Sequence, residues 1–129
     1  MKVVFLDANV LWSAAAHPQR PPWSWLTARP PKAEFITSHY ALAEARRNLT
    51  AADWPALDRI VTHLRLVPDA FGAPPPGVRL PGKDIPILAS AAAAQADLLV
   101  TGDQDFDQYF GRTLGGVKII LPRHLISEL

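Results

Sequence analysis

Val3-Val4-Phe5-Leu6-Asp7-Ala8-Asn9 is the stretch that decides the fold, because four apolar residues run directly into an aspartate. A short continuous apolar run is typical of a strand buried on both faces of a parallel sheet. A second such run, Leu98-Leu99-Val100, leads into Thr101-Gly102-Asp103. The carboxyl ends of parallel strands open onto the ligand crevice. If these two strands lie side by side, Asp7 and Asp103 come together at that edge of the sheet.

Strands and helices alternate along the rest of the chain. The apolar patterns predict further strands at Phe35–Thr37, Leu66–Val67 and Val117–Leu121. They predict helices at Asn9–Ala16, at Trp23–Ala28, from the Ser38 cap to Arg47, after an Asp53 cap, after an Asp84 cap, from Asp105 toward Phe110 and at Pro122–Glu128. Strands separated by helices imply right-handed crossovers. We therefore expect an α/β fold with a central, mostly parallel sheet of about five strands and helices on both faces.

Composition bounds the class of protein. The 129 residues fit one domain, 1–129, and the hydrophobic fraction of 49% is ordinary for a globular protein. No apolar run approaches the roughly 18 residues of a membrane span, and Asp7 interrupts the apolar start, so we expect neither a membrane segment nor a secretory signal. Cysteine is absent, which suits a cytoplasmic location and excludes thiolate metal sites. The net charge of +1 does not by itself indicate a nucleic-acid partner.

Four acidic residues are candidates for one cluster. Taken singly, Asp7, Asp84 and Asp103 each precede a predicted helix and could be simple N-caps, and Glu44 could be an exposed helix residue. Taken together, the predicted topology places all four at the carboxyl end of the sheet. Carboxylates held close repel one another, and a divalent cation bound by oxygen ligands offsets that repulsion. The joint arrangement predicts a metal site.

The chain resembles the PIN-domain nucleases, the family that includes the VapC-like toxins of bacterial toxin–antitoxin pairs. The resemblance rests on Asp7-x-Asn9 after an apolar strand, on Ala43-Glu44-Ala45-Arg46, on Lys83-Asp84-Ile85-Pro86-Ile87-Leu88-Ala89 and on Leu99-Val100-Thr101-Gly102-Asp103-Gln104-Asp105-Phe106. It runs from Lys2 to about Pro122, in the order that the family shows. No single motif would be specific, but the four together are.

The resemblance implies a PIN-like fold and a ribonuclease that hydrolyses RNA phosphodiester bonds with Mg²⁺ or Mn²⁺. It also implies a toxin restrained by an antitoxin protein. Carried over residue by residue, it assigns catalysis and metal binding to the acidic quartet Asp7, Glu44, Asp84 and Asp103, with Asp105 as second choice for the fourth acid and Asn9, Ser38 and Thr101 as polar support.

Two alternatives remain open at this stage. Gly102-Asp103-Gln104-Asp105-Phe106-Asp107 also matches a metal-binding pattern of haloacid-dehalogenase-like phosphatases, in which Asp7 would be the phosphorylated nucleophile, Ser38 a phosphate ligand and Lys83 a charge partner. Asn9 counts against that reading, because such enzymes usually carry there an aspartate that transfers a proton, and an amide cannot. The second alternative is a non-catalytic PIN-like RNA-binding module.

Contacts to partners are the least specific part of the pattern. Arg46, Arg47 and Lys83, with the more scattered Arg20 and Arg112, could bind RNA phosphates, although an ordinary solvated surface has the same composition. The tryptophans Trp12, Trp23 and Trp25 would suit a homodimer interface or a partner helix if they lie together on the surface, and the core otherwise. The four histidines show no metal-ligand spacing, and we expect them at the surface or at helix caps.

Overall fold

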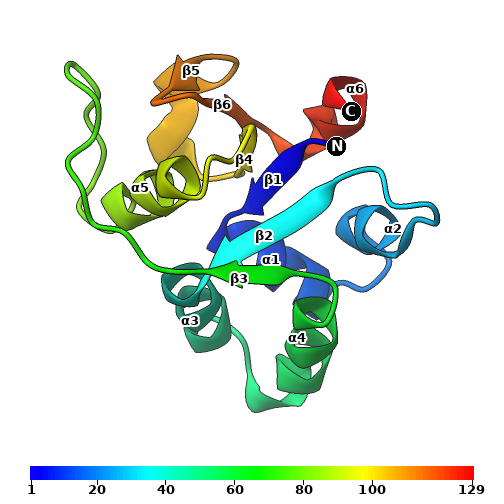
Figure 1. Cartoon of the computed structure of the whole chain (residues 1–129). Coiled ribbons are helices and arrows are strands. Elements are labelled where there is room, and N and C mark those ends of the chain that lie inside the picture. Colours follow the sequence, from blue (N-terminus) through cyan, green and yellow to red (C-terminus); the bar gives the residue numbers. More distant parts are fainter.

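Six strands form one sheet in the computed structural model, which describes residues 1–129 (Figure 1). Their order across the sheet is β3-β2-β1-β4-β6-β5, and every neighbouring pair is parallel except β5 with β6. The strands are β1 (Val3–Leu6), β2 (Glu34–Ser38), β3 (Arg65–Val67), β4 (Leu98–Val100), β5 (Thr113–Leu114) and β6 (Val117–Ile120). The sheet is thus mostly parallel, and β1 and β4 are its central neighbours, as the two apolar runs predicted.

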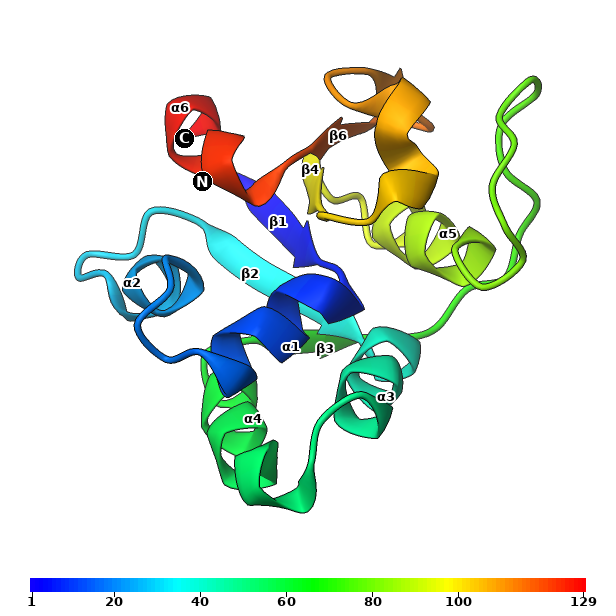
Figure 2. The same cartoon turned by 180° about the vertical axis from the view of Figure 1, so that it is seen from behind.

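Helices cover both faces of this sheet (Figures 1 and 2). They are α1 (Ala8–Ala16), α2 (Pro22–Thr27), α3 (His39–Arg47), α4 (Trp54–Val61), α5 (Ile85–Ala93) and α6 (Leu125–Glu128), with the 3₁₀ helices η1 (Ala51–Asp53), η2 (Gln104–Tyr109) and η3 (Pro122–His124). One core cluster joins the sheet to α1, α2, α4 and α6, and a second joins it to α5 and η2. None of the helices is both long and apolar enough to cross a membrane.

The burial of β1 shows why a continuous apolar run forms its centre. Successive side chains of a strand point to opposite faces. Val4 and Leu6 accordingly belong to the core beneath α1 and α4, and Phe5 belongs to the core beneath α5. All three are at most 1% exposed, so a polar residue at any of them would be buried in an apolar core. The α/β fold expected from the sequence is confirmed.

The sixth strand was not predicted. Thr113–Leu114 forms β5, which pairs antiparallel with Val117–Ile120 across the two-residue turn Gly115-Gly116. Both glycines have positive φ, 58° and 84°, which is the conformation that the tightest hairpin turns require. The glycine pair in the sequence carried this signal, but a strand of two residues is too short to show an alternating pattern.

Three predicted helix caps were wrong. Asp53 and Asp84 stand at the N-cap positions of α4 and α5, but both have helical backbone angles and neither side chain makes a capping hydrogen bond. Asp105 lies inside η2, and it is Asp103 that caps this helix by accepting a hydrogen bond from the Asp105 backbone N–H. By contrast, Ser38 caps α3 as predicted, since its hydroxyl accepts from the Ala41 N–H at 3.2 Å. The carboxylate of Asp84 is therefore free for other contacts.

Candidate metal centre

The carboxyl ends of β1 and β4 lie side by side, and they bring Asp7 and Asp103 to the same edge of the sheet. Asp7 follows Leu6 directly and begins α1, with its Oδ1 accepting a hydrogen bond from the Ala8 N–H at 2.6 Å. Its backbone N–H also donates to the carbonyl of Val100, so the end of β1 is fixed to the end of β4. The adjacency on which the sequence argument depended is present.

Thr101 joins these two aspartates through its hydroxyl group. The Thr101 Oγ1 donates to Asp7 Oδ2 at 2.8 Å and accepts from the Asp103 backbone N–H at 3.1 Å. It also accepts from Asn9 Nδ2 at 3.1 Å, and Asn9 itself donates to Asp7 Oδ2 and accepts from the Gly102 N–H. Thr101 is fully buried, so this network has one well-defined arrangement. Asn9 and Thr101 therefore link the ends of β1 and β4 through side-chain hydrogen bonds.

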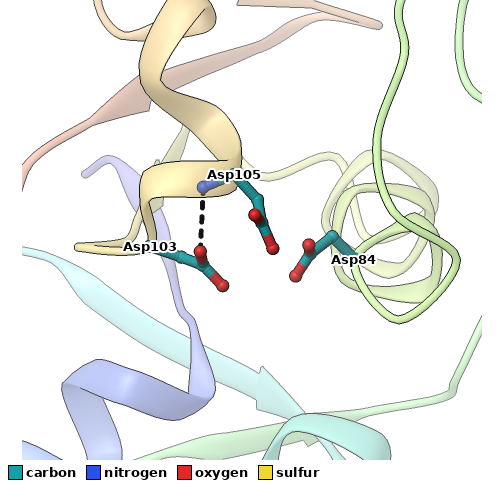
Figure 3. Close-up of side chains that lie close together, drawn as sticks. All are labelled: Asp84, Asp103 and Asp105. Atoms are coloured by element: carbon teal, nitrogen blue, oxygen red, sulfur yellow. Dashed lines mark hydrogen bonds between the residues drawn. The ribbon is translucent and has the colours of Figure 1, made fainter.

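Three aspartates from separate parts of the chain converge beside this network (Figure 3). Asp84 stands before α5, Asp103 follows β4, and Asp105 lies in η2. One carboxylate oxygen from each lies within 4.8 Å of the others. Asp105 therefore lies beside Asp84 and Asp103, although the sequence ranked it behind Asp103 for a single fourth position. The i, i+2 spacing of two aspartates after a strand was the signal for this pair.

Lys83 neutralises part of this cluster. Its Nζ lies 2.9 Å from Asp105, 3.1 Å from Asp103 and 3.3 Å from Asp84. One ammonium group thus contacts all three carboxylates at the point where they converge. The sequence had placed Lys83 among general RNA-binding cations or, in the phosphatase alternative, as a charge partner. Its position among three aspartates depends on tertiary structure and could not be derived from its neighbours in the chain.

Asp7 and Glu44 face the same open cavity but lie outside the three-aspartate group. The cavity has a volume of about 630 Å³. Its walls include Asp7, Asn9 and Trp12 from the β1–α1 region, Glu44, Arg47 and Asn48 from α3 and its end, and Lys83 and Asp103. All four acids of the predicted quartet therefore lie at this edge of the sheet, three of them lining the cavity and Asp84 beneath Lys83. The structure places five carboxylates here, not four.

The environment of the acids shifts their pKa values in opposite directions, upward for Asp7 and Asp84 and downward for Asp105. Burial is the main reason that the pKa of Asp7 rises from 3.8 to about 6, and the hydrogen bonds from Thr101 and Ala8 only partly oppose it. Burial also raises the pKa of Asp84, as does its hydrogen bond with Asp105, against the opposing effect of Lys83. Hydrogen bonds with Asp84 and Lys83 hold the pKa of Asp105 below its usual range. Burial lowers the pKa of Lys83, but hydrogen bonds with Asp105 and Asp103 outweigh it and raise that pKa.

The donor set fits a hard divalent cation. Every candidate ligand atom is a carboxylate oxygen, the type that Mg²⁺ and Mn²⁺ prefer, and no histidine belongs to the three-aspartate group. Five carboxylates face two cations, Lys83 and Arg47, at this edge, so negative charge is in excess. Asp84, Asp103 and Asp105 would hold a cation, with Asp7 on the β1 side of Asp103. A divalent ion would offset the repulsion from Asp103 and Glu44, which adds to the effect of burial in raising the pKa of Asp7.

The remaining predicted residues take varied positions. Ser38 is fully buried and is occupied in capping α3. Arg46 stacks on Trp54 at 4.8 Å, whereas Arg47 lines the cavity. The three tryptophans do not form an exposed patch, because Trp25 is only 5% exposed and belongs to the core. Trp12 and Trp23 are half-buried against the same core, and their indole N–H groups bond to the Asn48 and Ala14 carbonyls. Trp25 is thus a core residue, whereas Trp12 and Trp23 pack against the core and stay partly exposed, so their contact with a partner remains a prediction.

Comparison with known proteins gives a likeness of fold. No family model matches the chain, and no curated protein matches it. Among solved structures, the chain is similar to one described as the crystal structure of VapBC2 from Rickettsia felis bound to a DNA fragment from their promoter. The TM-score is 0.66 and the identity 17%, and the match covers 92% of this chain and 98% of the other. The chain therefore shares its fold, over nearly its whole length, with a chain of a VapBC complex.

Proposed function

We propose that the protein is a ribonuclease that depends on Mg²⁺ or Mn²⁺ and hydrolyses RNA phosphodiester bonds. The observation that carries the proposal is the convergence of Asp84, Asp103 and Asp105 within 4.8 Å, beside Asp7, at the carboxyl edge of a parallel sheet. A divalent cation, when bound, makes hydroxide accessible near neutral pH and offsets the charge that builds on phosphorus. Residues of the PIN-like motifs supply every carboxylate in the group.

The chain's own residues have distinct parts in this proposal. Asp84, Asp103 and Asp105 bind the cation, and Asp7 with Glu44 forms the acidic wall of the cavity that receives the scissile phosphate. Thr101 and Asn9 fix the orientation of Asp7 through the bonds described above. Arg47 and Lys83 present positive charge to the phosphates on either side of the acids. The cavity is open, which a polymeric substrate requires.

The geometry of Asp7 weighs against the phosphatase alternative. A nucleophilic carboxylate must present a free oxygen to the phosphorus atom. Asp7 is 3% exposed, its Oδ1 accepts from the Ala8 N–H, and its Oδ2 accepts from both Thr101 and Asn9. Ser38, the phosphate ligand of that reading, is buried beneath α3. The retained carboxylates likewise weigh against a binding module without catalysis.

The proposal extends to the biological setting. The VapBC2 structure contains a complex of that name with promoter DNA. We propose that this chain is the toxin component of a toxin–antitoxin pair, that an antitoxin protein restrains it, and that it acts in the cytoplasm, with a homodimer as its expected state. Co-purification of the chain with the product of an adjacent gene would test the antitoxin partner. Light scattering of the complex would then test the homodimer.

Cleavage of a mixed transfer and messenger RNA pool tests the activity. The native chain, Asp7→Asn and Asp84→Asn are each incubated with Mn²⁺, Mg²⁺ or EDTA. Asp58→Asn is the matched control, because Asp58 is an exposed residue of α4 that does not line the acidic cavity. We expect cutting by the native chain and the control only when metal is present, and a loss of at least a hundredfold in both site variants. Cutting that persists in EDTA or in both site variants would exclude this mechanism. Phosphate release from small phosphoesters, without RNA cleavage, would favour the phosphatase.

A further inference from the structure

A second cavity adjoins the acidic one and has a different chemical character. Its volume is about 430 Å³. Val10, Trp12 and Ser13 of α1 form one wall, and Pro22 and Trp25 of α2 form another. The loop at Gly102 and the helix η3 complete it. We call this cavity the α1–α2 pocket.

The α1–α2 pocket borders the acidic site. Asn9 and Trp12 line both cavities. Gly102, which borders the α1–α2 pocket, donates its N–H to Asn9 and directly precedes Asp103. A chain molecule with a phosphate at the acids would therefore reach this pocket by passing Asn9 and Trp12, which border both cavities.

Charge in the α1–α2 pocket is entirely positive. No aspartate or glutamate lines it, whereas Arg20 and Arg123 do. Arg20 donates to the Ser13 hydroxyl at 2.9 Å and pairs with no carboxylate, and Arg123 has no side-chain hydrogen bond or ion pair in the structure. Two arginines without acidic partners are complementary to phosphate groups.

The walls suit a flat, apolar ring system. Ligand pockets of this size combine apolar and aromatic lining with a few polar groups. Single-stranded RNA is recognised by stacking its unpaired bases on aromatic side chains and by contacting its phosphates with basic ones. Trp12 is half-buried and fixed by its bond to the Asn48 carbonyl, so it offers a rigid aromatic surface at the junction of the two cavities.

We infer that the α1–α2 pocket binds the nucleobase next to the cleaved phosphate of an RNA strand, with Arg20 and Arg123 contacting the adjoining phosphates. The inference rests on the proposed ribonuclease function and adds a source of sequence preference to it. An apolar peptide segment could fill the same walls, but it would use neither the two arginines nor the border that the pocket shares with the acidic cavity.

Nuclear magnetic resonance of the four tryptophan indole N–H groups tests the inference without any cleavage. Trp12 and Trp25 line the pocket, whereas Trp23 and Trp54 do not and serve as internal references. The full chain is titrated in EDTA with each of the four nucleoside 5′-monophosphates, with ribose 5-phosphate and with inorganic phosphate. Arg123→Glu is compared with Arg59→Glu, an exposed residue of α4 with the same change of charge.

We expect at least one nucleotide to shift the Trp12 and Trp25 signals, and ribose 5-phosphate and inorganic phosphate to leave them in place. Arg123→Glu should raise the nucleotide Kd by roughly fivefold or more, and Arg59→Glu should not change it. Equal shifts with ribose 5-phosphate, or no nucleotide effect on Trp12, would overturn the inference and leave the pocket to a protein partner. This titration contains no metal and measures binding only. Nucleotide binding without RNA cleavage would therefore contradict the proposed ribonuclease activity and leave the nucleobase pocket intact.

Discussion

Asp7→Asn should stabilise the metal-free protein at neutral pH, although it alters a residue of the site. Burial raises the pKa of Asp7 from 3.8 to about 6, and Asp7 is 3% exposed. The folded state therefore binds the Asp7 proton more tightly than the unfolded state does. Stability falls as the pH rises from about 4 through 6, and the ionised carboxylate then costs the folded state about 3 kcal/mol.

Asparagine removes this cost because it carries no charge at any pH. It also weakens the bond that Thr101 donates to Asp7 Oδ2, which offsets about 1 kcal/mol of the gain. We therefore expect Asp7→Asn to be more stable than the native chain by about 2 kcal/mol at pH 7.5 in EDTA. At pH 4, where native Asp7 is protonated, the variant should be equal or slightly less stable.

Urea unfolding in EDTA at the two pH values measures this difference. Asp58→Asn is the control, since Asp58 is exposed and removing its charge should change little at either pH. Saturating Mn²⁺ should stabilise the native chain and, because it would offset the charge of Asp7, narrow the difference between the two proteins at pH 7.5. If Asp7→Asn is destabilised equally at pH 4 and pH 7.5, the carboxylate is not strained by burial and the reasoning from its environment fails.

Three further outcomes follow from the same contacts. Mn²⁺ at a hundred times its Kd should stabilise the native chain by about 2.7 kcal/mol and raise its Tm by roughly 10 °C, measured in a thermal scan with EDTA as reference. Asp103→Asn should reduce this increase in Tm. Lys83→Met removes the ammonium that contacts three aspartates. Calorimetry should therefore show tighter Mn²⁺ binding, and melting in EDTA should show a lower Tm. An unchanged Mn²⁺ affinity would contradict the ion pairs. Thr101→Val keeps the shape but leaves the partners of its hydroxyl unpaired, which should cost about 1–3 kcal/mol in urea unfolding. A loss below that range would mean that water replaces the hydroxyl.

The fold was predictable from local patterns because its central strands are buried on both faces. The apolar runs at Val3–Leu6 and Leu98–Val100 identified β1 and β4, and the Ser38 cap located the start of α3. The strand β5 was missed, since two residues and a glycine turn carry too little periodicity. The alternation of strands and helices predicted a mostly parallel sheet, but the pairing of β1 with β4 was a condition of the argument and is shown only by the structure.

The candidate site was predictable in its location but not in its details. Asp7 and Asp103 each follow one of two neighbouring parallel strands, so the backbone alone places them at the same edge of the sheet. The positions of Asp84 and Asp105 depend on how α5 and η2 pack, so the sequence allowed a helix cap for each beside the metal-binding role that the resemblance implied. Lys83 lies among three acids that are 1, 20 and 22 positions away in the chain, which no spacing rule reports.

Anomalous diffraction from crystals grown with Mn²⁺ would locate the cation on which this account depends. We expect a manganese peak within coordination distance of Asp84, Asp103 and Asp105 oxygens, with the Lys83 ammonium displaced from its present contacts. Asp84→Asn crystals should show a weaker peak or none. Crystals of the native chain with saturating Mn²⁺ that show no peak there, and Lys83 still paired with all three aspartates, would contradict the metal centre.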